Sequence, residues 1–225
     1  MWAPDVIEKN GKFYFYFPDI PKDKSVFRRL GVAIADKPEG SYTVQTQPIK
    51  GIDGIDPNAF VDEDGQAYLY WGGGEKLYVA KLKDNMTEIV GKPQVIEGLP
   101  SSYKEGPFMF KRDGQYYFTF PHAPQGSEEL AYAIGDNPMG PFEYKGLFME
   151  RWRDSQWTNH HSVVEYQGQW YVFYHHQKLS GQKNLRSMEA EYLNFNTDGS
   201  IQKVIPTLQD HGSLVSYRNI WLREL

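Results

Sequence analysis

Four side chains suited to chemistry on a sugar stand at one repeated position in this sequence. Each lies nine residues before a glycine that follows a short apolar run and precedes an aromatic one. Carboxylates can donate and accept protons, and a flat indole ring can lie against a sugar face. If the four segments fold alike, these side chains converge on one carbohydrate site. The residues at this position are Trp2, Asp56, Glu105 and Asn159, and His160 is adjacent to the last.

Each of these residues also has an ordinary structural interpretation. Asp-Pro and Glu-Gly-Pro sequences usually mark the turn at which a strand begins. His160 and His161 could be a structural pair, and Trp2 could belong to the core. The equivalent repeat positions favour the functional interpretation for Asp56 and Glu105. His161 should point away from His160, because successive side chains of a strand alternate.

A hairpin that the sequence repeats four times must position these residues. Each copy has an apolar run, a polar turn ending in glycine and an aromatic run, which indicates a β-hairpin. The turn glycines are separated by 54, 49 and 54 residues. A period near 50 residues with a hairpin at the head of each unit predicts a β-propeller. The copies cover 2–17, 56–71, 104–120 and 159–174, and the glycines are Gly11, Gly65, Gly114 and Gly168.

Two further strand-like segments follow each hairpin, so each unit is expected to form a four-stranded blade. No window has a sustained helical period, and the predicted fold class is all-β. The propeller domain is expected over 1–206, with blades at roughly 2–52, 53–100, 101–150 and 151–206. Residues 207–225 are expected to be a C-terminal strand or a remnant of a jelly-roll domain. The further strand segments are 26–36, 41–52, 76–83, 93–99, 130–136, 141–150, 186–196 and 200–206.

The composition excludes several classes of partner. The formal net charge is −5, and no long basic run is present, which argues against nucleic acid. No apolar stretch approaches the length of a membrane span, so no membrane partner is expected. Cysteine is absent, which removes disulfides, thiol nucleophiles and thiolate metal sites. No signal peptide is expected in this chain.

The turns also predict which residues face each other across two hairpins. If Asp113-Gly114 is a two-residue loop, Glu105 faces His122, whose ring could tune the proton affinity of the carboxyl group. If Gln167-Gly168 is a two-residue loop, His160 faces His175. That pair could hold a metal or a water, although two histidines do not make a metal site. The run 62–65 lacks the remaining ligands of a calcium loop and is interpreted as a hairpin turn.

Four ordered motifs resemble glycoside hydrolase family 43, the five-bladed propeller enzymes that act on arabinose- and xylose-containing polysaccharides. They are WAPD, IDPNAFVDEDGQAYLYWG, EGPFMFKRDGQYYFTF and NHHSVVEYQGQWYVFYH, and the similarity extends from Trp2 to about Pro206. Within the family the sequence is most similar to arabinoxylan arabinofuranohydrolases and β-xylosidases, which invert the anomeric centre. The last stretch, 210–225, resembles the closing strand of a jelly roll of the 3-keto-disaccharide hydrolase type.

The resemblance implies roles for individual residues. Glu105 would be the general acid, and Asp56 the third carboxylate, which orients that acid and raises its proton affinity. His160 would lie near the channel centre, where many members hold a calcium ion or a water. No cofactor is required, and calcium would be structural. The residues implied to contact the sugar are Trp2, Phe108, His122 and Arg186; Arg186 could equally be an ordinary charge at a blade edge.

The family's general base is an aspartate on its first blade, upstream of the Trp-Ala-Pro-Asp motif. The sequence therefore resembles blades two to five, with four blades present and the base absent, and impaired catalysis is expected. With one blade of five absent, we expect an open ring, a compressed four-bladed ring or a gap filled by another chain. The alternatives are a non-catalytic carbohydrate-binding propeller and a scaffold for protein partners. The resemblance implies a plant cell-wall polysaccharide as partner and an extracellular or periplasmic location.

Overall fold

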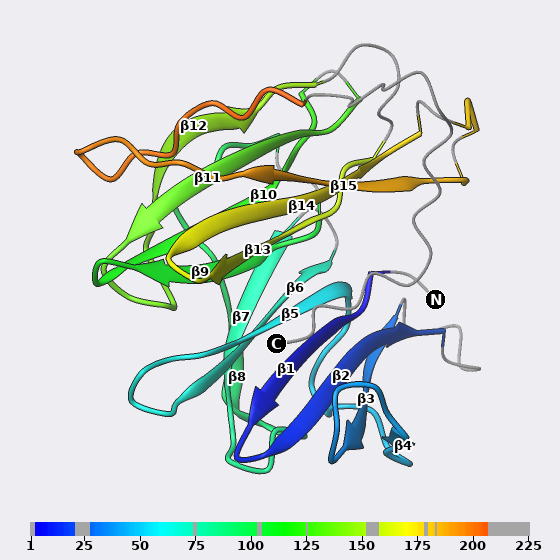
Figure 1. The fold of residues 1–225 in the computed structure, drawn as a ribbon. Helices are drawn as coiled ribbons and strands as arrows, with labels where there is room; N and C mark the ends of the chain where they lie inside the picture. Colours follow the sequence, from blue (N-terminus) through cyan, green and yellow to red (C-terminus); the bar gives the residue numbers. More distant parts are fainter. Residues whose placement is uncertain are drawn as a thin grey trace.

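A computed structural model describes residues 3–20, 28–73, 76–102, 105–124, 126–151, 158–177, 180–182 and 184–206. Over these ranges the chain forms fifteen β-strands and no helix (Figure 1), which confirms the all-β prediction. In the same ranges no helix is long and apolar enough to span a membrane. Trp2 and the stretch 207–225, both singled out in the sequence, lie outside the described residues.

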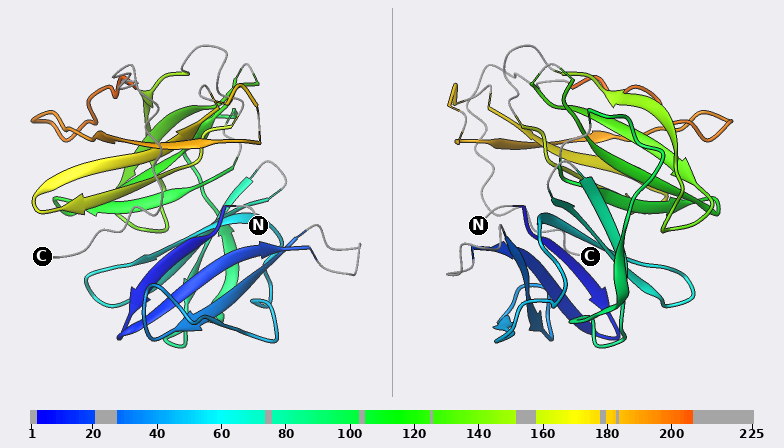
Figure 2. Two further views of the ribbon diagram at one scale, coloured as in Figure 1. Left: turned by 45° about the vertical axis from the view of Figure 1, so that its right-hand side comes forward. Right: turned by 180° about the vertical axis from the view of Figure 1, so that it is seen from behind.

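The strands form four antiparallel sheets, each built from consecutive strands of the chain (Figure 2). Within every sheet the spatial order follows the chain order, which is the up-and-down blade that the repeat predicts. The first sheet contains β1 (Asp5–Lys9), β2 (Lys12–Asp19), β3 (Arg29–Ala35) and β4 (Thr43–Val44). The second contains β5 (Ile55–Val61), β6 (Ala67–Gly73), β7 (Lys76–Leu82) and β8 (Ile89–Val95). The third contains β9 (Phe108–Arg112), β10 (Gln115–His122), β11 (Glu129–Gly135) and β12 (Glu143–Met149), and the fourth β13 (His161–Tyr166), β14 (Gln169–His176) and β15 (Ser187–Tyr192).

Three of the four leading hairpins close through the predicted two-residue turns. At Asn10-Gly11, Asp113-Gly114 and Gln167-Gly168 both residues have positive φ, between 50° and 79°. That is the type I′ geometry whose twist matches the flanking strands. The second hairpin instead has a longer loop, because its last pair is Val61 with Ala67. The loop between them is a turn, as predicted for 62–65.

Neighbouring sheets pack face to face, and the second and third sheets each contribute to two cores. The alternation along β10 illustrates this arrangement, since Phe118 points into the core shared with the second sheet and Tyr117 into the core shared with the fourth. Burying a large apolar side chain contributes about 1.5–3 kcal/mol. These cores therefore fix the sheets as successive blades. Their members include Tyr16, Leu30, Leu69 and Leu82 between the first two sheets, Tyr70, Val79, Phe118 and Phe120 between the next two, and Tyr132, Val163, Val172 and Tyr174 between the last two.

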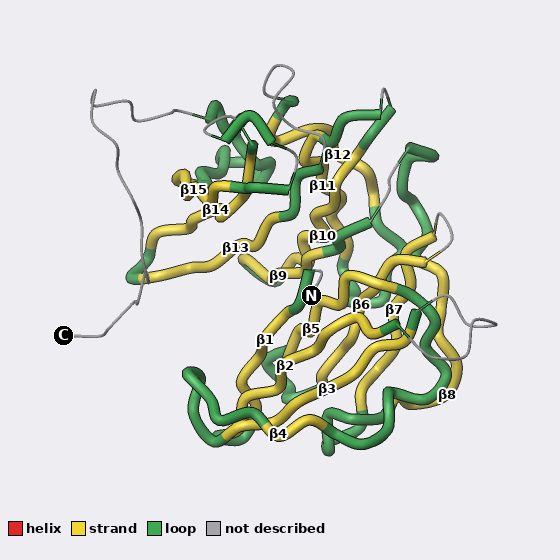
Figure 3. The backbone as a smooth tube through the Cα atoms, turned by 90° about the vertical axis from the view of Figure 1, so that its right-hand side faces the viewer, coloured by secondary structure: helices red, strands yellow, loops and turns green. Residues whose placement is uncertain are grey.

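The leading strand of each sheet lies nearest the middle of the molecule (Figure 3). Extensive contacts join β1 to β5, β5 to β9 and β9 to β13, and within the described chain β13 and β1 do not form such a contact. The outer faces of the first and fourth sheets expose apolar side chains, among them Val6, Val44, Val164 and Tyr192. Of the three predicted arrangements, the described sheets form the open one.

The prediction that residues 200–206 form the outermost strand of the fourth blade is wrong. The fourth sheet has three strands, and Ile201 forms only an isolated bridge with Phe195. Val204 crosses to the third sheet, where its backbone N donates to the Phe148 carbonyl oxygen at 2.7 Å. Ile201 and Val204 are both buried in the core between these sheets. Burial of these two side chains between the blades replaces a regular edge strand.

Two other predicted outer strands have different bounds from those expected. Only Thr43–Val44 of 41–52 is a strand, although the N–H groups of Gln45 and Ile49 still donate to β3 carbonyls. The residues between them bulge outward and include Pro48, which has no N–H to offer a ladder. The strand expected at 93–99 is β8, which begins at Ile89 because a tight turn closes through the Lys83 N to Glu88 O bond.

Candidate active site

Asp56 lies on a β-bulge near the beginning of β5. Ile55 pairs with Gly72 and Asn58 with Tyr70, so one extra residue is inserted between these two pairs. Asp56 has a φ of 56° and is almost fully buried. Aspartate tolerates this left-handed conformation better than most residues, and a bulge redirects the side chain that it carries. The direction of Asp56 is therefore set by the bulge and not by simple strand alternation.

Glu105 lies beside this bulge. A Cβ placed on Gly72 would be 3.5 Å from the Glu105 Cα and 3.7 Å from its Cβ. Since Gly72 is the ladder partner of Ile55, the backbone of Glu105 is packed next to the strand segment that carries Asp56. Glu105 is partly exposed, so its carboxyl group is accessible to a substrate. The structure thus brings the two predicted carboxylate residues to one place.

His160 packs on the residue that follows Glu105. A Cβ on Gly106 would lie 2.8 Å from His160 Cε1 and 3.0 Å from its Nε2, and Gly106 has a φ of 65°. A side chain at this position would both collide with the imidazole and strain the backbone. The glycine of Glu-Gly-Pro is required here because the histidine ring occupies the space.

Gly106→Ala is expected to lower turnover by about 10²-fold, because a displacement near 1 Å at a reacting group costs about that much. Strain from the positive φ should also lower the free energy of unfolding by about 1–2 kcal/mol. Gly114→Ala is the matched control, since Gly114 has a φ of 78° and nothing within 4 Å of its Cβ position. Kinetics and denaturant unfolding of both variants measure the two effects. Equal kinetic losses in the two variants would contradict the arrangement.

The predicted pairing of His160 with His175 is confirmed. The His160 backbone N donates to His175 Nε2 at 3.0 Å, and Arg186 Nη1 lies 3.4 Å from the same nitrogen. Because Nε2 accepts the backbone proton, the neutral ring carries its own proton on Nδ1. Arg186, on the segment leading into β15, is thereby placed beside the two histidines.

Burial keeps this histidine group uncharged. It lowers the pKa of His160 to about 4 and that of His175 to about 3, and the positive charge of Arg186 acts in the same direction. Both rings are therefore neutral near pH 7. They can donate or accept hydrogen bonds there but cannot act as cations.

His161 points away from His160, as the alternation predicts. Its Nε2 is 2.7 Å from Thr119 Oγ1, and that hydroxyl donates its proton to the Phe108 carbonyl oxygen. His161 Nε2 must therefore be the donor to Thr119. Burial lowers the pKa of His161 to about 3. This histidine is a structural tie between the third and fourth sheets.

The predicted pairing of Glu105 with His122 does not form. The register runs from Arg112 with Gln115 to Phe108 with Thr119 and then stops, because Pro107 has no N–H and Gly106 turns the chain. His122 instead pairs with Glu129 of β11, and its Nδ1 is 3.7 Å from Glu129 Oε2.

Phe108 and Asn159 were both singled out in the sequence, and the structure gives them other surroundings than the carboxylates. The Phe108 ring lies 6.0 Å from the His161 ring and borders a central cavity. Asn159 is buried, its N donates to Glu128 Oε2 at 2.6 Å, and its Nδ2 is 3.8 Å from Met149 Sδ. Asn159 therefore anchors the fourth sheet to the third and does not join the carboxylates. Glu128 carries no sequence signal that would have revealed this role.

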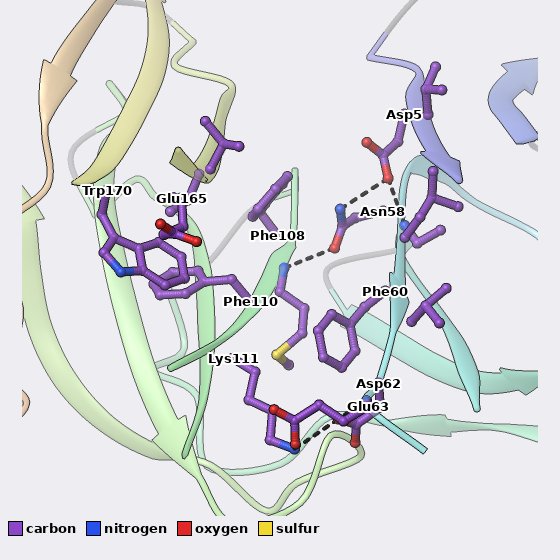
Figure 4. Close-up of a pocket in the computed structure, with 17 residues that line it drawn as sticks. Asp5, Asn58, Phe60, Asp62, Glu63, Phe108, Phe110, Lys111, Glu165 and Trp170 are labelled. Atoms are coloured by element: carbon purple, nitrogen blue, oxygen red, sulfur yellow. Dashed lines mark hydrogen bonds and ion pairs between the residues drawn. The ribbon is translucent and has the colours of Figure 1, made fainter. Parts of the chain in front are cut away.

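A cavity of about 420 Å³ extends along the four inner strands beyond the carboxylates (Figure 4). Aromatic rings and charged side chains both border it, and Lys111 is held by Asp62 at 2.9 Å and Glu63 at 2.8 Å. Asp56, Glu105 and His160 are not among its lining residues. The cavity and the carboxylate site are therefore different places. Its lining includes Asp5, Phe60, Phe108, Phe110, Glu165 and Trp170.

Asp5 and Asn58 form a hydrogen-bonded group that the sequence analysis did not anticipate. Asp5 Oδ2 accepts from Asn58 Nδ2 at 3.1 Å and from the Ala59 N at 2.7 Å. Burial raises the pKa of Asp5 to about 6, and these hydrogen bonds oppose the shift. Asp5 thus joins β1 to β5.

The raised pKa of Asp5 predicts that stability falls as pH rises. A carboxyl group whose pKa is higher in the folded chain contributes stability below its ordinary pKa of 3.8 and loses it as pH rises through about 6. Asp5→Asn keeps an oxygen acceptor without this titration. Relative to Asp5→Asn, the native chain should lose about 2 kcal/mol between pH 4 and pH 7. Urea unfolding at several pH values tests this, and parallel pH profiles of the two proteins would refute it.

The described residues do not fit a protein-built metal site at His160. No group of three or more His, Asp or Glu side chains in the described ranges could hold a metal ion. Calcium takes about 6–8 oxygen ligands, and His160 offers one nitrogen. No step of the chemistry is assigned to a metal here.

Comparisons with known proteins agree with the fold. A family model described as "Glycosyl hydrolases family 43" matches residues 1–201. The xylosidase/arabinosidase 43A of Humicola insolens is 38% identical over 89% of this chain and 74% of its own length. A crystal structure of a GH43_1 enzyme from Xanthomonas citri is 32% identical, with a TM-score of 0.84 over 93% of this chain and 75% of that one.

A third similar protein is a GH43 β-xylosidase/α-arabinofuranosidase from a compost microbial metagenome, solved with xylotriose in a calcium-free form. It is 34% identical, with a TM-score of 0.82 over 90% of this chain and 73% of that chain.

Proposed function

The chain belongs to glycosyl hydrolases family 43, and from this premise we propose that it acts on arabinofuranosyl or xylosyl linkages of plant arabinoxylan or arabinan, with inversion. The observation that carries the proposal is the packing of Glu105 against Gly72, the ladder partner of Ile55 next to Asp56, with His160 packed on the residue after Glu105. A partly exposed carboxyl group with a second carboxylate residue nearby can supply the proton that a departing glycosidic oxygen requires.

Glu105 is the general acid in this proposal. Its proton passes to the glycosidic oxygen as the bond from that oxygen to the anomeric carbon breaks. Asp56 is buried and is assigned the role of the carboxylate that acts through Glu105 by fixing the orientation of the acid. Arg186 and His160 lie together beside the site and are assigned to hydrogen bonding with sugar hydroxyl groups. Trp2, Phe108 and His122 are assigned to further sugar contacts.

The water side of the reaction lacks a carboxylate at the equivalent positions of the described sheets. Inversion requires a base on the face opposite the acid, with the two carboxyl groups roughly 6.5–9.5 Å apart. In the fourth sheet the position is held by Asn159, which is turned toward Met149. We therefore propose that this chain alone hydrolyses slowly, since a general base typically contributes about 10²–10⁴-fold.

The same proposal includes a ring of the five-bladed type, with the first blade of that ring outside the four sheets. Its support is the pair of outer faces on the first and fourth sheets, where Val6, Val44, Val164 and Tyr192 are exposed. Every other face of the four sheets is covered by a neighbouring sheet. A further sheet between them would cover both faces and could carry the base. Proton transfer by carboxylates needs no cofactor, and a calcium ion near His160 would have a structural role.

Incubation with nitrophenyl α-L-arabinofuranoside, nitrophenyl β-D-xyloside and xylotriose tests the function. We expect slow pentose release in which proton NMR shows the inverted anomer first. A product of retained configuration would overturn the mechanism. Xylotriose binding without any turnover would favour the alternative of a non-catalytic carbohydrate-binding propeller, for which the missing base-side carboxylate is the specific observation. If the chain neither binds nor cleaves these sugars, the remaining alternative is a scaffold for protein partners.

A further inference from the structure

Asn58 connects three neighbouring inner strands. Its Nδ2 donates to Asp5 Oδ2 on β1 at 3.1 Å, and its Oδ1 accepts from the Met109 N on β9 at 2.8 Å (Figure 4). Asp5 also accepts from the Ala59 N at 2.7 Å. Asn58 is 3% exposed, so these bonds have no competition from bulk water. The first, second and third sheets are thereby tied together at one side chain.

A carboxamide is the side chain that this position requires. The Met109 N–H can only donate, and the Asp5 carboxylate can only accept. Asparagine offers one acceptor and one donor group on opposite sides of a short side chain. An aspartate here would face the Asp5 carboxylate with no proton to share, and an alanine would leave buried groups unpaired at a cost of about 1–3 kcal/mol each.

The position of Asn58 relates this tie to the two carboxylates. Asn58 is the first residue back in register after the bulge that carries Asp56. Met109 follows Glu105 by four residues on the neighbouring inner strand. The bond from the Met109 N to Asn58 Oδ1 therefore joins β9, which begins just after Glu105, to β5, which carries Asp56.

We propose that Asn58, held by Asp5, is a positioning residue that keeps the Asp56 bulge beside Glu105. Its catalytic consequence rests on the proposed function, whereas its geometric consequence does not. The bulge places Asp56 in a left-handed conformation, which is strained for a residue other than glycine. The three hydrogen bonds around Asn58 hold the downstream end of that bulge against both neighbours.

Three variants test this assignment. Asn58→Ala removes both side-chain bonds. Asn58→Asp keeps an oxygen that accepts from the Met109 N but has no N–H to donate to Asp5 Oδ2, so it removes only the bond to β1. Tyr116→Phe is the matched control, because the Tyr116 hydroxyl also bonds across a sheet boundary, to Asp62, but does so at the opposite end of the inner strands.

Activity is the first readout. Asn58→Ala should lower kcat by about 10–10²-fold with KM changed less than about threefold, because the substrate contacts remain and only the acid is misplaced. Asn58→Asp should lose a comparable amount, because its carboxylate cannot donate to Asp5. Tyr116→Phe should lower stability and leave kcat within about twofold. Equal effects of Asn58→Ala and Tyr116→Phe on kcat, or an unchanged kcat in Asn58→Asp, would overturn the proposal.

A second readout does not depend on turnover. With carbon-13 label in the glutamate carboxyl groups, Asp56→Asn should move the Glu105 resonance, because the two groups are neighbours. In the Asn58→Ala background that response should shrink severalfold, and in the Tyr116→Phe background it should persist. An unchanged response in Asn58→Ala would refute the positioning role even if the chain proves inactive. A normal response with no hydrolysis would instead refute only the proposed function.

Discussion

Glu105→Gln is expected to lower pentose release from xylo- and arabinoxylo-oligosaccharides by about 10²–10⁴-fold, the usual contribution of a general acid. A sugar hydroxyl is a poor leaving group and must receive a proton as it departs. Glutamine fills the same space beside Gly72 but has no proton of suitable acidity to give. The substitution leaves the packing on Gly72 and Gly106 intact, so the protein should fold normally.

The leaving group distinguishes loss of the acid from loss of the site. A dinitrophenyl pentoside departs as a stabilised anion without protonation, and its hydrolysis by Glu105→Gln should fall by less than about tenfold. Glu143→Gln is the control, because Glu143 lies on the outermost strand β12 and its carboxylate forms an ion pair with Lys145 at 2.8 Å. Equal losses on both substrates would contradict the assignment of Glu105 as the acid.

The hairpins were predictable because their turns are local. The Asn10-Gly11, Asp113-Gly114 and Gln167-Gly168 turns fix their registers through positive φ values at both residues, and no distant contact is needed. The pairing of His160 with His175 followed directly from such a register and holds in the structure. Neighbouring positions of a hairpin can be derived by counting wherever the turn type can be recognised.

The site itself depends on features that counting misses. Asp56 and Glu105 share an offset of nine residues from their glycines, yet one lies on a bulge and the other precedes its strand by three residues. The same count placed Asn159 in the ring, where the structure turns it toward Met149 and Glu128. Bulges and buried polar partners depend on tertiary packing, and no single hairpin specifies them.

Outer strands were the least predictable elements for a related reason. An outer strand forms ladder hydrogen bonds on one side only, so burial of its side chains against another sheet can displace it. Val204 shows this, because it leaves its own blade to bury its side chain against the third sheet. Inner strands such as β5 and β9 also pair on one side only, but they contact the neighbouring inner strands, and Asn58 joins β5 to both β1 and β9.

Azide is expected to accelerate cleavage by this chain by about 10–10²-fold, which is part of the contribution that a general base would make. Water must lose a proton when it attacks the anomeric carbon, and the described sheets place no carboxylate at the positions equivalent to Asp56 and Glu105 on that side. Azide is already an anion and needs no base. Its terminal nitrogen forms the new bond to the anomeric carbon, the bond to the glycosidic oxygen breaks, and the proton of Glu105 goes to that oxygen.

The product identifies the mechanism. Attack from the face opposite the leaving group should give a glycosyl azide of inverted configuration, which mass spectrometry and proton NMR distinguish from free pentose. Glu105→Gln should abolish the azide effect on oligosaccharides and preserve it on a dinitrophenyl pentoside, because only the former needs the acid. Efficient hydrolysis that azide does not accelerate would mean that the chain already supplies a base. The proposal that the base comes from a further sheet would then be wrong. The assignment of Glu105 as the general acid would be unaffected by that result.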